Sequence, residues 1–326
     1  MSVKRPLKAV LLLFLLSAAA LAQSSSMSLL ESGRADEAIR TFNARIQQNP
    51  NDAEAYNLLA RIYFQLERWD DSIRAAEKSV ALQSQNSEYH QWLGRAYGEK
   101  ADSLGRLHPL SAISLVRKTK AELEKAVSTD STGKNLEARA DLSEFYTEAP
   151  TIMGGDKTKA RQLADYVLKY DPALAHYMYG RIEEQTNSKG KAEQEYKTAI
   201  QISGNLSRYW VALGSFYRRA GRLQEIEDAV NQSLNAKHQG SVSYFDAASL
   251  LLQGGRNYPE AIQLFRKYIA SDNPAEDGPV FQAHYFLGQL LEKQGDTQAA
   301  AQEYRAALAL ASQFQPAQDA LAKLSR

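Results

Sequence analysis

The sequence of 326 residues contains no cysteine. A chain without cysteine forms no disulfide, carries no lipid attached through a thiol and has no thiol nucleophile. It also lacks the hydrolase motif G-x-S-x-G and the metalloprotease motif H-E-x-x-H. Two pairs of adjacent acids, Asp70 with Asp71 and Glu183 with Glu184, point about 100° apart on a helix and do not converge on one atom. We therefore expect a protein that is not an enzyme and uses no cofactor.

Neither sign of charge is in excess, because 39 Lys and Arg face 38 Asp and Glu. Proteins that bind nucleic acid or an anionic membrane surface through charge need a basic patch or stripe. No such stripe is present in this balanced sequence. We therefore expect no nucleic-acid partner.

The apolar run near the start is too short to span a bilayer, which takes roughly 17–25 residues. Three basic residues within positions 4–8 precede the run Ala9–Leu16, and small residues follow up to the A-x-A pattern of Ala20–Ala22. This order is typical of a secretory signal peptide. We expect cleavage after Ala22, no stable membrane insertion, and a mature chain that is exported to the periplasm or secreted. Its 36 Lys and Arg would then face 38 Asp and Glu.

The chain does contain a pattern that returns about every 34 residues between residues 33 and 312. Its clearest copy is the segment Arg208–Tyr217, which contains W-x2-L-G-x2-Y, followed by a second helical pattern through Ile226, Val230 and Ser233. Each copy offers a bulky residue, Leu with a small residue, and Tyr or Leu on its first helix, here helix A. Its second helix, helix B, offers small, bulky and small residues.

Most copies fill these positions. They comprise Tyr56, Leu59, Ala60, Tyr63 with Ser72, Ala76, Ser79; His176, Tyr179, Gly180 with Ala192, Tyr196, Ala199; Trp210, Leu213, Gly214, Tyr217 with Ile226, Val230, Ser233; Tyr244, Ala247, Ala248, Leu251 with Ala261, Phe265, Tyr268; and His284, Leu287, Gly288, Leu291 with Ala300, Tyr304, Ala307. In the copy that begins with His176, Glu183 stands where helix A is expected to have an aromatic residue. The pattern resembles the tetratricopeptide repeat family.

The resemblance implies an all-α fold, a right-handed superhelical solenoid of helix pairs with a C-terminal capping helix. Each helix of about 12–15 residues is marginal alone and gains stability by stacking on its neighbours. Glycine inside a helix costs roughly 1 kcal/mol relative to alanine, so Gly214 and Gly288 indicate close approach of two helices. We expect each of these glycines to face a small residue of helix B.

The signal peptide and the repeat pattern together divide the chain into four segments. They are a signal peptide at 1–22, a truncated first repeat at 23–52, an array of about seven repeats at 53–314 and the capping helix at 315–326. Two insertions interrupt the array near 100–112 and 147–156. The first is expected to form an irregular turn at Pro109, and the second to end a helix at Pro150 and Gly154–Gly155.

In this family the concave groove is lined by helix A residues that do not take part in packing. The resemblance selects Asn57, Arg61, Gln91, Arg95, Tyr177, Arg181, Arg218, Arg219, Phe245, Tyr285 and Gln289. Phe245 and Tyr285 would suit apolar anchors of a bound peptide. His90, His176 and His284 fall in the bulky position of Trp210, so we expect them to be packing residues and not metal ligands.

Arg61, Arg95 and Arg181 have two possible roles. Their guanidinium groups are suited to clamp a carboxylate or an acidic segment of a partner. Alternatively, they are solvated or pair with Glu54, Glu88 and Glu184 of the chain itself.

Two functions remain open from the sequence. The first is an exported, non-catalytic scaffold that binds protein or peptide partners through its groove. The second is a small-ligand-binding or transport-accessory protein of the cell envelope. A continuous open groove would favour the first, and a sealed apolar pocket between repeats the second.

The signal peptide gives the first testable prediction. The native protein should begin at Gln23 and occur in the periplasmic or secreted fraction, because the export machinery removes residues 1–22. Mass spectrometry of the N-terminal peptide of the native protein measures this directly. A native protein that retains Met1 would contradict the prediction.

Overall fold

The structure is a computed structural model that describes residues 27–105, 108–186, 188–238 and 240–324. The expected signal peptide lies outside the described residues. Within them the chain is almost entirely helical, with two isolated bridges, Leu206 to Lys237 and Ala275 to Gly278, and no strand. The expected all-α class is confirmed.

The helices follow one another with short connections. Their bounds are α2 Ala35–Gln48, α3 Ala53–Gln65, α4 Trp69–Leu82, α5 Ser87–Leu104, α6 Pro109–Thr129, α7 Leu136–Glu148, the 3-10 helix η2 Thr151–Met153, α8 Lys157–Val167, α9 Pro172–Gln185, α10 Lys189–Ile202, α11 Ser207–Arg219, α12 Gln224–Asn235, α13 Val242–Gly254, α14 Tyr258–Ile269, α15 Val280–Lys293, α16 Thr297–Leu310 and α17 Gln315–Leu324. None of the described helices is both long and apolar enough to cross a membrane.

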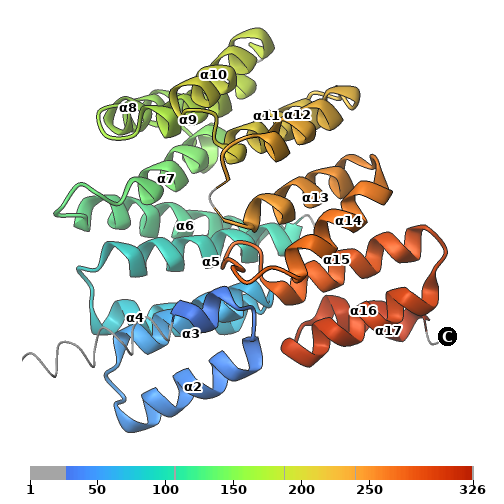
Figure 1. Ribbon diagram of the computed structural model, residues 1–326. Helices are drawn as coiled ribbons and strands as arrows, with labels where there is room; N and C mark the ends of the chain where they lie inside the picture. The colour runs from blue at the N-terminus through green and yellow to red at the C-terminus, as the bar shows by residue number, and fades with distance from the viewer. Residues whose placement is uncertain (1–26, 106–107, 187, 239, 325–326) are drawn as a thin grey trace, which may run out of the picture.

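Consecutive helices form the expected pairs, from α3 with α4 to α15 with α16, and the pairs stack into a superhelical solenoid (Figure 1). Helix α17 packs on α16, where the capping helix was expected. Several helices begin at an Asp or Asn whose side chain accepts a hydrogen bond from a backbone N–H of the first turn, which stabilises a helix start. These residues are Asp52, Asn86, Asn135, Asp156, Asp171, Asn257 and Asp296.

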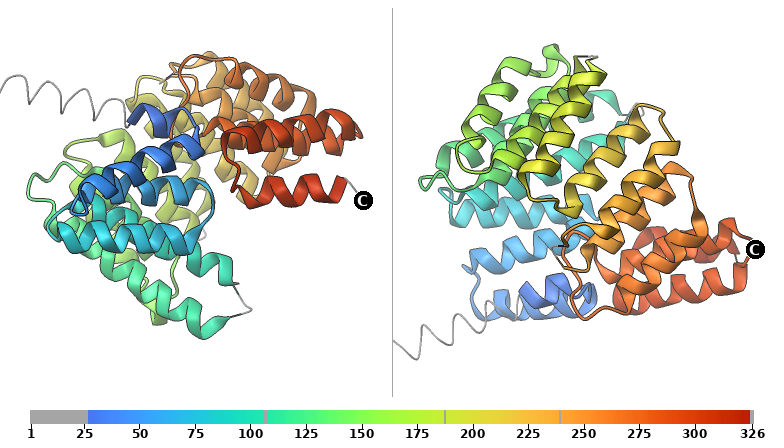
Figure 2. Two further views of the ribbon diagram at one scale, coloured as in Figure 1. Left: turned by 90° about the horizontal axis from the view of Figure 1, so that it is seen from below. Right: turned by 45° about the horizontal axis from the view of Figure 1, so that its top comes forward.

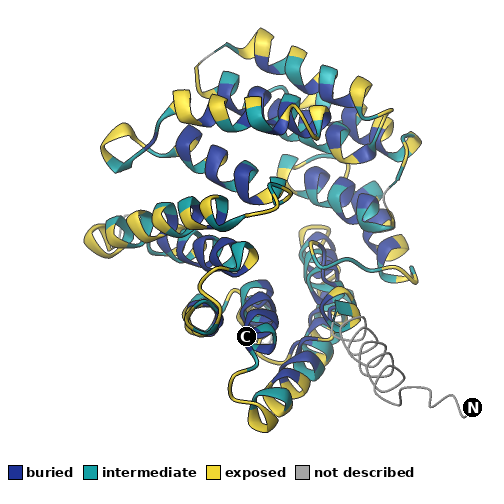
Figure 3. Ribbon diagram, turned by 90° about the vertical axis from the view of Figure 1, so that its left-hand side faces the viewer, coloured by how far each residue is buried: buried dark blue, intermediate teal, exposed yellow. Residues whose placement is uncertain are grey.

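Each helix buries the face that it turns toward its neighbours and exposes the opposite face (Figure 3). On α14, for example, Ala261, Ile262, Phe265 and Tyr268 are buried at spacings of helical period. Fully burying one large apolar side chain contributes roughly 1.5–3 kcal/mol. The repeated positions therefore build a core that runs along the whole stack.

The helix A glycines approach bulky side chains of other helices. A Cβ atom on Gly288 would lie 2.6 Å from Cε1 of Tyr304, and one on Gly214 would lie 2.4 Å from Cδ2 of Leu250 in the next helix pair and 3.2 Å from Cβ of Ala229. The expectation that each glycine faces a small residue is therefore wrong for Gly288. The reason is that the bulky residue of helix B points into the space that the glycine leaves.

The first insertion lengthens two helices instead of forming a long turn. Helix α5 continues to Leu104, and α6 begins at Pro109, so the connection is short. Proline is compatible with the first helical position because the N–H that it lacks has no partner within the helix there. The expected irregular turn over residues 100–112 is thus wrong.

The second insertion follows the end of α7. The chain leaves the helix before Pro150, forms η2 and turns at Gly154, which has φ +98°. Gly155 is required for a different reason, because a Cβ atom there would lie 1.8 Å from the carbonyl oxygen of Ala149. Of the two glycines, only Gly154 has a positive φ.

Histidine in the bulky position of helix A contacts a glutamate of helix B. The Nδ1 atom lies 2.6 Å from a carboxylate oxygen in three pairs, which are His90 with Glu122, His176 with Glu195 and His284 with Glu303. Burial lowers the pKa of His90, but its hydrogen bonds to Glu122 and to the Ser84 carbonyl outweigh this effect and raise the pKa above its usual range. These histidines thus hold helices together through polar contacts as well as packing.

The two ends of the stack touch (Figures 1 and 2). Leu30 and Phe42 share one buried cluster with Phe281 and Phe314, although more than two hundred residues separate them. A Cβ atom on Gly33 would lie 2.5 Å from the backbone nitrogen of Val280. We call this contact, between residues 30–65 and 276–314, the closure. It was not expected from the sequence.

Two glycine substitutions test the packing. Gly288→Ala should lower the free energy of unfolding by about 1–3 kcal/mol, because the added methyl group overlaps the buried Tyr304 ring. Gly190→Ala is the matched control on α10, where nothing lies within 4 Å of the added atom. Alanine should there raise stability by up to about 1 kcal/mol. Urea melts measure both, and two changes of the same sign would contradict the packing described.

Candidate functional site

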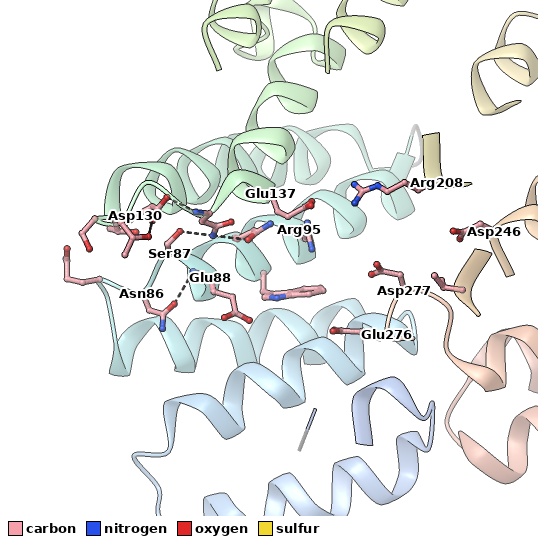
Figure 4. A pocket seen from close by; sticks show the side chains of 18 residues that line it. Asn86, Ser87, Glu88, Arg95, Asp130, Glu137, Arg208, Asp246, Glu276 and Asp277 are labelled. Atoms are coloured by element: carbon pink, nitrogen blue, oxygen red, sulfur yellow. Dashed lines mark hydrogen bonds between the residues drawn. The ribbon is translucent and has the colours of Figure 1, made fainter. Parts of the chain in front are cut away.

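Two adjoining cavities lie on the inner face of the solenoid. The larger has a volume of ≈ 960 Å³ and is lined by residues of α5, α6, α7, α11 and α13, and of the connections before α5, after α6 and before α15. The smaller, ≈ 330 Å³, is lined by residues of α7, α9, α11 and α13. Arg208 and Asp246 line both, so the two cavities meet at these side chains. Figure 4 shows the larger cavity with charged side chains on opposite walls.

The helical period explains which residues reach the cavities. Residues four apart lie on one face of a helix. Gln91 and Arg95 of α5 are such a pair, as are Tyr177 and Arg181 of α9. The groove positions expected on these two helices therefore do line the inner face.

Arg61 forms the charged part of the closure. Its Nη1 atom lies 2.8 Å from Oε1 of Glu88, and its Nε atom donates to Oε1 of Glu276 at 2.8 Å. Beside it, Gln65 donates to the backbone carbonyl of Glu276 at 3.1 Å. Burial lowers the pKa of Arg61, but hydrogen bonding to Glu276 and its charge outweigh this and raise the pKa. Arg61 thus stabilises the contact between the ends of the chain.

Arg95 is also held within the protein. Its Nε and Nη2 atoms donate to the two oxygens of Asp141, at 2.6 and 3.0 Å. Gln91 donates to the same carboxylate at 2.8 Å. The ring of Trp92 lies below the Arg95 guanidinium at 4.8 Å and below that of Arg61 at 5.0 Å. The bidentate pair and the ring fix the arginine in place.

Arg181 lies in the wall of the smaller cavity among carboxylates. It is buried, and its Nη2 atom donates to Glu144 at 3.0 Å and to Glu148. Its Nη1 atom lies 3.5 Å from Glu184 but has no hydrogen-bond partner among the described residues. Next to it, burial raises the pKa of Tyr177 to about 12, so this phenol stays neutral.

The three arginines pair with carboxylates of the chain itself, which was the second of their two possible roles. Some of these carboxylates differ from the expected ones. Glu88 pairs with Arg61, whereas Glu54 pairs with Arg45. Arg95 takes Asp141, which comes from the next helix pair. The guanidinium groups that would clamp an acidic segment are therefore already engaged.

Four further expected groove residues lie elsewhere. Phe245 is buried among the rings of Phe265, Tyr268 and Phe286, so it belongs to the core and not to a free surface. Asn57 is buried, and Gln289 donates to the Tyr285 hydroxyl at 2.8 Å. None of the four residues, Phe245, Asn57, Tyr285 and Gln289, lines either cavity.

Of the two neighbouring arginines expected in the groove, Arg219 lines the smaller cavity and pairs with Glu184 at 2.7 Å. Arg218 lines neither cavity, and its Nε atom has no hydrogen-bond partner among the described residues. A helix turns by about 100° per residue, so neighbouring residues face different directions.

Of the eight charged residues that line the larger cavity, only Arg95 was selected from the sequence as a groove residue. Four of the others, Glu137, Arg208, Asp246 and Asp277, form no ion pair with another described residue. The sequence does contain a signal for Asp246, because it is the one charged residue of helix α13. Asp277 lies in a connection, where no period predicts its direction. Among the described residues, no cluster of His, Asp and Glu is arranged to hold a metal ion.

The surroundings change the acidity of Asp246 strongly. Burial by the surrounding protein raises its pKa to about 7, and the negative charge of Asp277 adds to this, while Arg208 opposes it. Protonation of Asp246 is therefore far easier than for an exposed aspartate. A cation brought into the cavity would favour the ionised form.

Comparison with known proteins agrees with the repeat pattern. Tetratricopeptide repeat models match residues 29–96 and, with a second model, residues 154–206 and 245–313. No curated protein matches the chain in sequence.

Three solved structures are similar to this one. Yeast Tom70 is 14% identical with a TM-score of 0.51, and the match covers 89% of this chain and 58% of that one. A tetratricopeptide repeat protein from Parabacteroides merdae is 14% identical over 84% of this chain and 99% of its own, with a TM-score of 0.41. MamA is 21% identical over 51% of this chain and 87% of its own, with a TM-score of 0.39.

The closure can be tested by reversing one charge. Glu276→Lys places a second cation beside the buried Arg61 and removes its acceptor, so the ends should separate and the radius of gyration should increase. Asp272→Lys is the matched control, because Asp272 is exposed in the same connection and forms no ion pair with any described residue. Small-angle X-ray scattering measures both variants. An unchanged radius for Glu276→Lys, with the helix content retained, would contradict the role of Arg61.

Proposed function

Because the chain belongs to the tetratricopeptide repeat family, whose members are in general protein-interaction scaffolds, we propose that it holds a segment of a partner protein in the cavities of its inner face. The proposal includes export through the expected signal peptide, so that the partner is met in the periplasm or outside the cell. No catalytic step is part of the proposal.

The observation that carries this proposal is the larger cavity. Its ≈ 960 Å³ are at the upper end of the roughly 300–1,000 Å³ typical of ligand pockets, and its walls come from five helices and three connections. Charged and polar side chains dominate these walls, whereas small-molecule sites are mostly apolar. This lining supports a polar protein segment over the small ligand of the alternative function.

A cavity-filling substitution tests the proposal. Ala212 lines the smaller cavity, so Ala212→Trp should occupy it and reduce the capture of partners from an envelope extract. Ala81→Trp is the matched control, because Ala81 is exposed on α4 and lines neither cavity. Proteins recovered with immobilised wild type and with each variant are compared by quantitative mass spectrometry. Thermal melts establish that both variants are folded.

A variant at a second surface distinguishes binding in the cavities from binding at the insertions. Ile152 of η2 is 92% exposed and stands beside a cleft lined by Ala101, Phe145 and Met153. If Ile152→Ser abolishes capture while Ala212→Trp leaves it unchanged, partners bind at the insertions and the cavity proposal is wrong.

A further inference from the structure

The charges of the cavities indicate the chemistry of their occupant. Six carboxylate residues and two arginines line the larger cavity, which are Glu88, Asp130, Glu137, Asp246, Glu276 and Asp277 against Arg95 and Arg208. Arg95 is engaged by Asp141, and Asp130 is engaged by Arg139 at 2.6 Å. Of the cations in this wall, only Arg208 is free of a carboxylate partner. An anionic occupant would therefore meet more repulsion than attraction.

Three of these carboxylates remain available. Glu137, Asp246 and Asp277 come from α7, α13 and the connection before α15, and none of them is paired with a cation. Asp246 and Asp277 lie on one side of the cavity and Glu137 on the other, as Figure 4 shows. A positively charged group between these walls would offset their mutual repulsion.

A second observation, independent of the acids, comes from the smaller cavity. The Arg181 side chain is buried and lines this cavity, and its Nη2 atom is engaged by Glu144 and Glu148. Its Nη1 atom has Glu184 only at 3.5 Å and donates no hydrogen bond within the described part of the chain. Buried donors without an acceptor are rare because leaving one unpaired costs free energy. An occupant with an oxygen acceptor, such as a peptide carbonyl, would satisfy this nitrogen.

We propose that the cavities bind a cationic peptide segment, with a Lys or Arg side chain against Asp246 and Asp277 and a main-chain carbonyl accepting from Arg181. This proposal rests on the proposed function and specifies its partner. A peptide supplies both groups at once, a cation and a carbonyl oxygen.

Proton linkage follows from the surroundings of Asp246. Asp277 and Arg208 are the charges that act on it most directly. The other charged residues that line the two cavities are Glu88, Arg95, Asp130, Glu137 and Glu276 in the larger and Glu144, Arg181 and Arg219 in the smaller. Burial and Asp277 raise the pKa of Asp246 to about 7 in the free protein, and a bound cation lowers it. Binding therefore releases a proton. Affinity should rise about tenfold between pH 6 and pH 8, as expected when one group of this pKa must ionise.

Calorimetry with defined peptides tests the proposal. Three blocked nonapeptides carry lysine, glutamine or glutamate at the same three positions and are titrated into the purified protein. The lysine peptide should bind most tightly, and its affinity should fall with rising salt because charge contacts are screened. Asp246→Asn should weaken this binding and abolish its pH dependence. Asp228→Asn, on the exposed side of α12, should change neither.

The outcomes separate this inference from the proposed function. Tighter binding of the glutamate peptide, or lysine-peptide binding that Asp246→Asn leaves unchanged, overturns the cationic occupant. A polyamine such as spermidine that binds where the lysine peptide does not overturns the peptide and supports a small cation instead. If no lysine peptide binds while Ala212→Trp still loses its captured partners, the inference fails and the proposed function stands.

Discussion

The contact between the first and last helix pairs determines what the inner face of this molecule can do. In an open solenoid the inner face would be a long groove that continues past both ends. Here Phe281 and Phe314 pack against the N-terminal helices, and Arg61 reaches Glu276 across the contact. The inner side chains therefore face one another across a central space. Their charges act on the same occupant because residues of α5, α11 and α13 share one cavity.

The arginines of the inner face stabilise the contacts between helix pairs. Arg95 and Arg181 each join two helix pairs through carboxylates, as Arg61 joins the two ends. Such partly buried pairs fix the relative placement of neighbouring repeats, since removing one partner would leave the other charge buried and unpaired. Because these arginines are paired, the remaining unpaired carboxylates make the lining of the larger cavity negatively charged. A sequence rich in inner-face arginine thus produces a cavity with unpaired carboxylates.

The sequence was sufficient for the helix pairs and their packing positions, because these follow from local periodicity. Leu213, Gly288 and Tyr304 occupy the buried places that their positions in the repeat require. The closure could not be predicted in this way. It depends on the small rotation between each repeat and the next, summed over the array, and it joins Arg61 to a residue 215 positions away. The ion-pair partners and the direction of Asp277 depend on the same accumulated geometry.

The closure also affects how the molecule loses its structure. In an open repeat array each unit contacts only its neighbours, so the terminal units have a single neighbour and fray first. Here Asp36 accepts hydrogen bonds from the backbone of Ser312, and Gln282 donates to the backbone carbonyl of Gln65. Each terminal repeat thereby gains a second neighbour. Fraying of the repeats joined by the closure therefore breaks contacts at both ends of the array, which makes the loss of structure more cooperative than in a linear array with the same repeats.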